Sequence, residues 1–334
     1  MRKSMGETES TSCQACGEVV CPNYSQAVDF DSGEQAYTLA HCPRCGLGWI
    51  SPQMSPRDLG QYYCDDYYGG ETKKFFSAME YLVHTLGRFK AKAIINQINK
   101  QGITSKTPNV LDIGCGRGVL LNSLAHYGVK CSGVEPSVFP KNDTAIKIFQ
   151  QDFLDVSLQD GSFDVVIMWH VFEHLLDPQD VLDKIHRILR PNGLLIIAVP
   201  NFSSTQSQWF MGAWFHLDLP RHVYHYSCGA LRQILKRHYF KLRHLHTWCI
   251  DQSIYGFIQS ALNKTGWFRG NELYSFLKSS GEKTLSVKTL LQLSIALILL
   301  PAAMVEFVYN GLSKRGSCII VYASRQSIPT KHQE

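Results

Sequence analysis

The sequence predicts an α/β protein in which a mainly parallel sheet is covered by helices on both faces. From Pro108 onward, short apolar runs alternate with longer amphipathic segments, and this alternation is typical of βαβ units. A glycine-rich turn at 114–118 directly follows the first apolar run. Ligands of such sheets bind beyond the carboxyl ends of the strands, so the turn indicates where a ligand would lie.

The individual elements can be placed from periodicity and from turn residues. A helix is expected from Pro178 to Arg190, because Asp177 can cap it, Pro178 suits its first position, and its apolar residues share one face. Asn192 and Gly193 then turn the chain into the next strand. Strands are expected at 109–113, 129–135, 145–149, 163–169, 193–199 and 317–324.

Two C-x-x-C pairs precede the sheet, each followed by a glycine. The chain has eleven cysteines and no apolar leader behind MRKSMGETESTS, which favours metal ligands over disulfides and a cytoplasmic protein. Four thiolates in two tight turns suit a structural Zn²⁺, which would supply folding energy that a small segment lacks. We therefore expect a zinc ribbon over residues 1–60, with Cys21 and His41 as spare ligands. The expected zinc ligands are Cys13, Cys16, Cys42 and Cys45.

Residues 61–106 are expected to link the ribbon to the sheet. The run QYYCDDYY at 61–68 is either a packing seam or part of a substrate pocket. An amphipathic helix is expected over 77–100, with an apolar stripe that belongs to the core. The stripe consists of Leu82, Leu86, Phe89, Ala93, Ile94 and Ile98.

The charge of the chain points to no particular partner. A formal net charge of +5 is too small to argue for nucleic acid and is compatible with an acidic substrate or an anionic membrane surface. The ribbon region has no basic run interleaved with aromatic residues, so RNA binding is not favoured.

Two acidic residues near the glycine turn strengthen its interpretation as a ligand-binding site. A bare G-x-G-x-G is a weak signal, but Asp112 precedes the first glycine by two residues and Glu135 ends the next expected strand. An acid at that place can accept hydrogen bonds from the hydroxyls of an adenosine ribose. A dinucleotide-binding dehydrogenase would place the third glycine one residue later, as in G-x-G-x-x-G.

Over 108–201 and 317–324 the sequence resembles the class I S-adenosylmethionine-dependent methyltransferases. The resemblance implies a Rossmann-like sheet of seven strands with the last one antiparallel, and S-adenosylmethionine as cofactor. It further implies that the glycine loop wraps the methionine part, that Glu135 holds the ribose, that Asp152 and Phe153 face the adenine, and that Trp169 and His170 lie near the methyl group. The implied loop residues are Asp112, Gly114, Gly116 and Gly118.

Methyl transfer to a hydroxyl or an acidic carbon needs a base near the cofactor sulfur. Histidine is the natural candidate near neutral pH. His222 ranks first, then His174, with His216 as a further candidate, and Arg221 could grip a phosphate or carboxylate. A structural hydrogen bond is the alternative role for each histidine, and a divalent-metal site at His170, Glu173 and His174 is a weaker alternative.

The acceptor is expected to be the oxygen or carbon of a small molecule, a sugar or a lipid-linked compound. The segment WHVFEH replaces the N/D-P-P-Y/F motif of enzymes that methylate DNA bases, so nucleic acid is not favoured. Two alternatives stay open: an RNA methyltransferase that binds its substrate through the ribbon, and a non-catalytic, cofactor-binding protein that recruits partners. The oligomeric state is undetermined.

An uncharged apolar segment, 289–305, interrupts the expected sheet domain before its last strand. It is expected to be a buried helix, a hairpin that bends at Pro301, or a helix in a membrane interface, since a simple span would separate strand 317–324 from its sheet. We favour peripheral contact of 285–310 with the inner face of the membrane, helped by Trp267, Phe268, Arg269, Lys314 and Arg315. The expected units are therefore 107–250 for the cofactor domain, 251–316 for the apolar helical insertion and 317–326 for the last strand.

Overall fold

The computed structural model of the chain describes residues 10–30, 35–62, 77–137, 146–268, 271–278 and 286–328. Most of the tyrosine-rich run at 61–68 lies outside these ranges, as do Ala145 and Arg269. The run's expected role as seam or pocket wall stays a prediction.

A seven-stranded sheet forms the centre of the molecule, with the order β12-β13-β10-β9-β6-β7-β8. Neighbouring strands from β10 through to β8 pair in parallel, whereas β13 is antiparallel to both β10 and β12. This confirms the predicted fold class and the antiparallel last strand. The strands are β6 (Asn109–Ile113), β7 (Lys130–Val134), β8 (Lys147–Phe149), β9 (Phe163–Trp169), β10 (Leu189–Pro200), β12 (Phe240–His246) and β13 (Cys318–Arg325).

The edge strand β12 was not predicted from the sequence. Its residues, FKLRHLH, alternate apolar and polar side chains as a half-exposed strand does, and Lys241 and His244 are exposed. Charged residues on an edge strand discourage pairing with another chain. The alternation was the signal that could have identified it.

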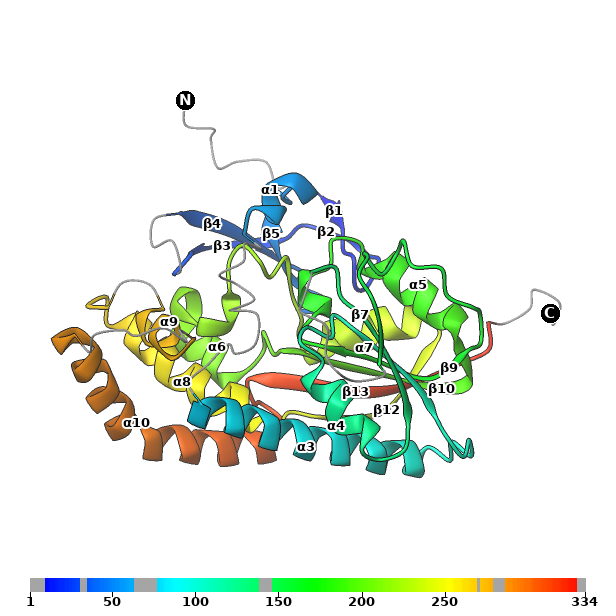
Figure 1. Cartoon of the computed structure of the whole chain (residues 1–334). Coiled ribbons are helices and arrows are strands. Elements are labelled where there is room, and N and C mark those ends of the chain that lie inside the picture. The colour runs from blue at the N-terminus through cyan, green and yellow to red at the C-terminus, as the bar shows by residue number, and fades with distance from the viewer. Residues whose placement is uncertain are drawn as a thin grey trace.

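Helices cover both faces of this sheet (Figure 1). On β9, Val165 and Ile167 pack with α3 (Ser77–Lys100) and α4 (Val119–Ala125), whereas Val166 and Met168 pack with α5 (Pro178–Ile188) and α7 (Cys228–Arg237). Alternate side chains of a strand point to opposite faces. The strand is apolar on both faces because both are buried.

Helix α5 follows the expected pattern with one correction. Val181, Leu182 and Ile185 are buried as predicted, and Pro178 stands in the first turn. The side chain of Asp177, however, makes no capping hydrogen bond, because the residue has φ −117° and ψ 65° instead of the extended conformation usual at that position.

The expected apolar stripe of α3 is only partly core. Ile94 and Ile98 are buried against the sheet, but Leu82 and Phe89 are 47% and 66% exposed, and Ala93 is exposed as well. The second half of the helix packs on the sheet through Ala91, Ile94 and Ile98. In the first half, Leu82 and Leu86 line a cavity described below.

The N-terminal segment forms two short β units. Strands β1 (Thr11–Ser12) and β2 (Val19–Val20) pair with each other, and β3 (Asn23–Val28), β4 (Ala36–His41) and β5 (Gly48–Ser51) form an antiparallel sheet. Strand β11 (Tyr224–His225) of the main domain joins this second sheet by pairing with β5. After β5, the chain forms the short helix α1 (Pro56–Gly60). The segment is thus attached to the main domain by main-chain hydrogen bonds.

Beside the sheet, three helices form an apolar cluster: α8 (Ile250–Lys264), α9 (Glu272–Lys278) and α10 (Val287–Leu312). Helix α6 (Thr205–Phe210) packs against α8. The apolar segment is one continuous helix, α10, with Pro301 inside it, so the hairpin alternative was wrong. A wholly buried helix is also excluded, because Leu297, Ile298 and Val305 are 71%, 76% and 70% exposed. Figure 1 shows α10 (orange) at the edge of the molecule.

A buried polar network fixes the second half of α10. Gln206 donates to the Glu306 carboxylate at 2.9 Å, Asn310 donates to the same carboxylate at 2.9 Å, and Thr205 donates to Asn310 at 2.7 Å. Buried polar groups are tolerated when they bond to one another. The network therefore holds the helix on α6 while its apolar face stays exposed.

Candidate active site

The glycine loop joins β6 to α4 in a conformation that favours glycine. Gly114, Gly116 and Gly118 have φ of +70°, +51° and +74°, a region that side chains with a Cβ rarely adopt. A Cβ on Gly114 would lie 2.4 Å from Val171, whereas a Cβ placed on Gly116 would have no atom of the described residues within 4 Å, apart from its chain neighbours. Within the described part of the chain, the space beside Gly116 is open to a ligand.

Two buried carboxylates meet at this loop. Glu135 accepts hydrogen bonds from the amides of Gly116 and Ser137 at 3.0 and 3.1 Å. Asp112 is 3% exposed, and its Oδ1 has no hydrogen-bond partner among the described residues. Burial, together with the charge of Glu135, raises the pKa of Asp112 to about 8. Glu135 thus has donors, whereas Asp112 Oδ1 needs a donor that the described part of the chain does not supply.

S-adenosylmethionine fits these residues chemically. Its ammonium and ribose hydroxyls are the donors that a pair of buried carboxylates needs, and its positive charge would offset theirs. The orphaned oxygen of Asp112 and the open space at Gly116 are therefore what a cofactor site at this loop requires.

The other expected cofactor residues lie in different surroundings. Asp152 is exposed and accepts a hydrogen bond from the Leu154 amide at 2.8 Å. Phe153 is 4% exposed and packs in the core, with the Lys184 ammonium 4.8 Å from its ring centre. Trp169 ends β9, and its buried indole N–H has no partner among the described residues. Their contact with a cofactor stays a prediction.

A cavity of about 670 Å³ lies next to the ends of β9 and β10. Its floor carries His170, Glu173 and Pro200, and α3, α8 and α9 supply apolar and aromatic walls. Three of the expected catalytic residues (His174, His216 and His222) and Arg221 also line it. The tertiary structure thus brings the two histidine-rich segments of the sequence together in one cavity.

His222 is held with one ring nitrogen available for proton transfer. Its Nδ1 lies 2.9 Å from the main-chain oxygen of His216 and must donate to it. Its Nε2 lies 3.6 Å from Asp218 and 3.9 Å from Glu173. In this tautomer Nε2 is an acceptor, and two carboxylates stand ready to stabilise the charged ring.

The neighbouring histidines are less suited to act as bases. Burial lowers the pKa of His174 to about 4, helped by the charge of His222. Burial also lowers the pKa of His216 to about 4, and the Nε2 of this ring is 3.0 Å from the Gln252 oxygen on α8. Both rings contact main-chain oxygens, which is the structural role left open by the sequence.

Arg221 is already engaged in an ion pair. Its Nε lies 3.2 Å from both oxygens of Asp218, and its Nη2 bonds to the same carboxylate. Although burial raises the pKa of Asp218, the Arg221 guanidinium holds it well below its usual range. Asp218 therefore stays ionised beside His222.

Glu173 is a site residue that sequence reasoning left among weaker alternatives. It is 1% exposed, and its Oε1 lies 3.3 Å from Nδ1 of His170. Burial raises the pKa of Glu173, but His170 beside it outweighs burial and lowers the pKa. The short 3₁₀ turn Phe172–His174 at the end of β9 positions this side chain. An i, i+3 histidine–glutamate pair in WHVFEH was the available signal.

Among the described residues, three groups of side chains could hold a metal ion, and two of them contain two or more ligands expected from the sequence. The four ribbon cysteines lie with their sulfurs within 4.8 Å of one another, and Gly17 and Gly46 both have φ +75° where they follow the second cysteine of each pair. The donor atoms of Glu173, His174 and His222 also lie within 4.8 Å of one another. The spare ligands expected from the sequence, Cys21 and His41, belong to neither group.

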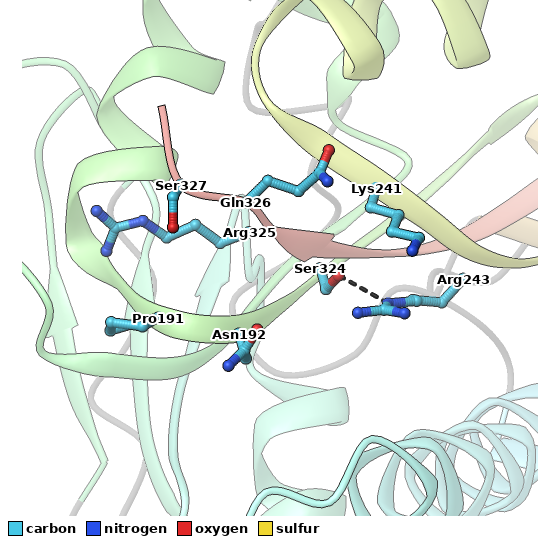
Figure 2. A pocket seen from close by; sticks show the side chains of 8 residues that line it. All are labelled: Pro191, Asn192, Lys241, Arg243, Ser324, Arg325, Gln326 and Ser327. Carbon is cyan, nitrogen blue, oxygen red and sulfur yellow. Dashed lines mark hydrogen bonds between the residues drawn. The ribbon is translucent and has the colours of Figure 1, made fainter. Parts of the chain in front are cut away.

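A second hollow, of about 410 Å³, lies at the opposite end of the sheet (Figure 2). Lys241, Arg243 and Arg325 make it basic, and Arg243 donates to Ser324 at 2.8 Å. The described residues that line it include no carboxylate, histidine or cysteine. It lies where β10 begins and β13 ends, far from the carboxyl ends of the parallel strands, so it is not the reaction site.

Comparison with known proteins agrees with this geometry. Residues 82–245 match the methyltransferase domain family. Over this part, the chain is similar to S-adenosylmethionine-dependent methyltransferases. Ubiquinone biosynthesis O-methyltransferases of Histophilus somni and Pasteurella multocida are each 29% identical to it, over 163 and 168 residues. These matches cover 43% of this chain in both cases, and 66% and 67% of the relatives. The chain thus spans about two thirds of the length of these two relatives, and 56% of the length of the Colwellia psychrerythraea enzyme.

A solved structure with a similar course is the 1,6-didemethyltoxoflavin N1-methyltransferase of Burkholderia thailandensis. It is 11% identical, with a TM-score of 0.47, and the match covers 87% of this chain and 96% of that chain.

Because the pKa of Asp112 is raised, we expect the stability of the cofactor-free protein to depend on pH. Between pH 4 and pH 8 the unfolded chain releases the Asp112 proton while the folded chain keeps it, so this group's contribution to stability falls as the pH rises. The Asp112→Asn variant should match the wild type in melting temperature near pH 4 and exceed it near pH 8. Thermal melting monitored by circular dichroism measures the difference. A constant difference, equal to that of the exposed control Asp160→Asn, would contradict the pKa shift.

Proposed function

We propose that this protein transfers a methyl group from S-adenosylmethionine to the oxygen of a small-molecule acceptor, with His222 as the base. The observation that carries the proposal is the position of His222 Nε2, which lies in the cavity between Asp218 and Glu173. The curated relatives are named for O-methylation, which favours oxygen over carbon. An acidic carbon is the second candidate for the acceptor atom.

The residues of the glycine loop and of the strand ends would hold the cofactor. Asp112 and Glu135 would accept hydrogen bonds from it, and Gly114, Gly116 and Gly118 would let the main chain approach it. Asp152 and Phe153 are proposed at the adenine, and Trp169 with the main chain of His170 at the methionine part. When bound, S-adenosylmethionine supplies an electrophilic methyl group and leaves as S-adenosylhomocysteine.

The residues of the cavity would manage the acceptor proton. His222 Nε2 takes the proton from the acceptor hydroxyl as the oxygen–methyl bond forms, and Asp218 and Glu173 stabilise the imidazolium. Arg221 acts through Asp218 by keeping that carboxylate ionised and in place. His174 and His216 would shape the cavity around this centre.

The walls of the cavity favour an acceptor with an apolar part. Leu82, Ile254, Ile258 and Leu277 come from three helices and face the same space, with Tyr255 and Tyr274 beside them. A lipid-linked compound or another amphiphile fits such walls better than a free sugar does, because apolar surface is buried on binding.

Helix α10 supports peripheral contact with a membrane. Among the described residues, α10 is the helix that is long and apolar enough to cross a membrane. Its most apolar stretch has a mean hydropathy of 2.1, and 17% of that stretch is buried. Because β13 follows directly and pairs in the central sheet, we propose that α10 lies along the interface. We further propose that the four ribbon cysteines hold a structural Zn²⁺.

The cofactor assignment predicts the effect of removing both carboxylates. The Asp112→Ala, Glu135→Ala double variant should bind S-adenosylmethionine at least about 100-fold more weakly, because two buried acceptors are lost. Isothermal titration calorimetry measures this, with the exposed Asp160→Ala as matched control. Equal binding by the double variant and the wild type would refute the assignment.

The base assignment predicts a loss of rate with an intact cofactor site. His222→Asn should lower kcat by about 10²- to 10⁴-fold with an acceptor found by mass spectrometry of extracts, while S-adenosylmethionine binding stays within about twofold. His244→Asn, on the exposed edge strand, is the control. An unchanged kcat for His222→Asn excludes it as the base.

The ribbon predicts a defined loss of metal. Cys42→Ser should lower the zinc content by about one ion per chain and lower the melting temperature, since metal binding supplies folding energy to this segment. Inductively coupled plasma mass spectrometry measures the zinc. The exposed Cys21→Ser is the control, and an unchanged content in Cys42→Ser would remove the ribbon site.

The membrane proposal predicts a dependence on the exposed face of α10. The Leu297→Glu, Ile298→Glu double variant should lose co-sedimentation with vesicles of phosphatidylglycerol and phosphatidylethanolamine, because two charges would have to enter the apolar layer. Val19→Glu, 71% exposed on the ribbon, is the matched control. Sedimentation of the double variant equal to the wild type, or none for the wild type, would contradict the proposal.

A further inference from the structure

A further group of soft metal ligands reaches the cavity through His170, which lines it. It joins Cys249, directly before α8, Cys318, the first residue of β13, and His170, directly after β9. Cys249 is 5% exposed and Cys318 is fully buried. Three separate parts of the chain thus bring two thiols and an imidazole to one point, where methyl transfer as proposed above needs no thiol.

The distances within this group are close to those of a zinc site. The two sulfurs and a His170 ring nitrogen all lie within 4.8 Å of one another, and Cys318 Sγ is 4.0 Å from His170 Nε2. Bond lengths of 2.3 Å to sulfur and 2.0–2.1 Å to nitrogen, at tetrahedral angles, put such ligand atoms about 3.5 to 3.8 Å apart. A shift of a few tenths of an ångström would bring Cys318 Sγ and His170 Nε2 to this separation.

The surroundings orient the imidazole as a metal site does. His170 Nδ1 lies 3.3 Å from the buried carboxylate of Glu173, which leaves Nε2 directed at the sulfurs. A carboxylate on the second nitrogen of a ligand histidine is the usual support of such a site. His170 has φ +56°, an uncommon conformation for a residue with a Cβ, and this turn places its side chain at the sulfurs.

One side of the group faces the cavity. The carboxylate of Asp251, whose Oδ1 lies 3.3 Å from Cys249 Sγ, lines the cavity together with His170. The other oxygen of Asp251 accepts a hydrogen bond from Lys90 at 2.6 Å, so the negative charge of this corner is partly balanced. Three protein ligands with an open side are typical of zinc sites that keep a fourth position for an oxygen ligand.

We propose that Cys249, Cys318 and His170 bind a second Zn²⁺, whose fourth position faces the cavity and takes water or an anionic oxygen of a bound molecule. Two thiolates and an imidazole select zinc over magnesium or calcium, which prefer oxygen ligands. Each thiol releases a proton when the metal binds. The site is separate from the ribbon cysteines and uses no residue that acts as the proposed base.

Metal content tests the proposal without any assay of methyl transfer. The full-length wild type, purified without chelators and equilibrated with zinc chloride, should hold about two zinc ions per chain. The Cys249→Ser, Cys318→Ser double variant should hold about one, as should the ribbon variant Cys42→Ser. Cys131→Ser, a buried cysteine outside both groups, should keep two and serves as the matched control.

Cobalt gives a second readout that does not depend on the stability of a variant. Co²⁺ titrated into the zinc-free Cys42→Ser protein should produce thiolate-to-metal absorption in the near ultraviolet, and the single variant His170→Gln should weaken it. One zinc per wild-type chain, absent in Cys42→Ser, would overturn the proposal. So would a Cys42→Ser protein without a cobalt–thiolate band. S-adenosylmethionine binding measured on the same samples separates this result from a failure of the cofactor site.

Discussion

The parallel pairing of β9 with both β6 and β10 is the constraint on which the site depends. Asp112 on β6 is paired with Ile167 on β9, and Ala198 on β10 is paired with Trp169 on β9. The three strands therefore end at the same edge of the sheet. The glycine loop, the 3₁₀ turn with Glu173 and the start of the acceptor region then follow at that edge. This pairing places the loop at 114–118 and the residues after 169 at the same edge of the sheet.

The buried charges at this edge come close to neutralising one another. Asp218 is paired with Arg221, and Glu173 lies among His170, His174 and His222. Asp112 and Glu135 are the exception, since Asp112 has a raised pKa and an oxygen without a partner among the described residues. Because the other buried charges have partners and the oxygen of Asp112 has none in the described part of the chain, a cationic ligand would be bound beside Asp112 and Glu135.

The N-terminal segment and α10 are attached to the main domain in different ways. Strand β11 pairs with β5, Ser227 donates to the Cys45 oxygen at 2.6 Å, and Arg237 donates to the Gln14 oxygen at 2.9 Å. These contacts hold the segment close to the cavity, whose lining includes residues that lie just before β11 in the chain. Helix α10 is held by its polar network at one end and leaves an apolar face uncovered within the described part of the chain.

The fold class, six of the seven strands of the central sheet and the glycine turn at 114–118 could be predicted from the sequence, because these features rest on local periodicity and on glycines that few other residues can replace. The sequence also pointed to both histidine-rich segments. The folded structure was needed to show that His222 Nε2 lies near Asp218 and Glu173, that Arg221 is paired with Asp218, and that Cys249 and Cys318 meet His170. Those facts depend on contacts between residues far apart in the chain, and on burial, which no local pattern encodes. The exposure of Leu82 and Phe89 on α3 was missed for the same reason, whereas the edge strand β12 carried a local alternation that was overlooked.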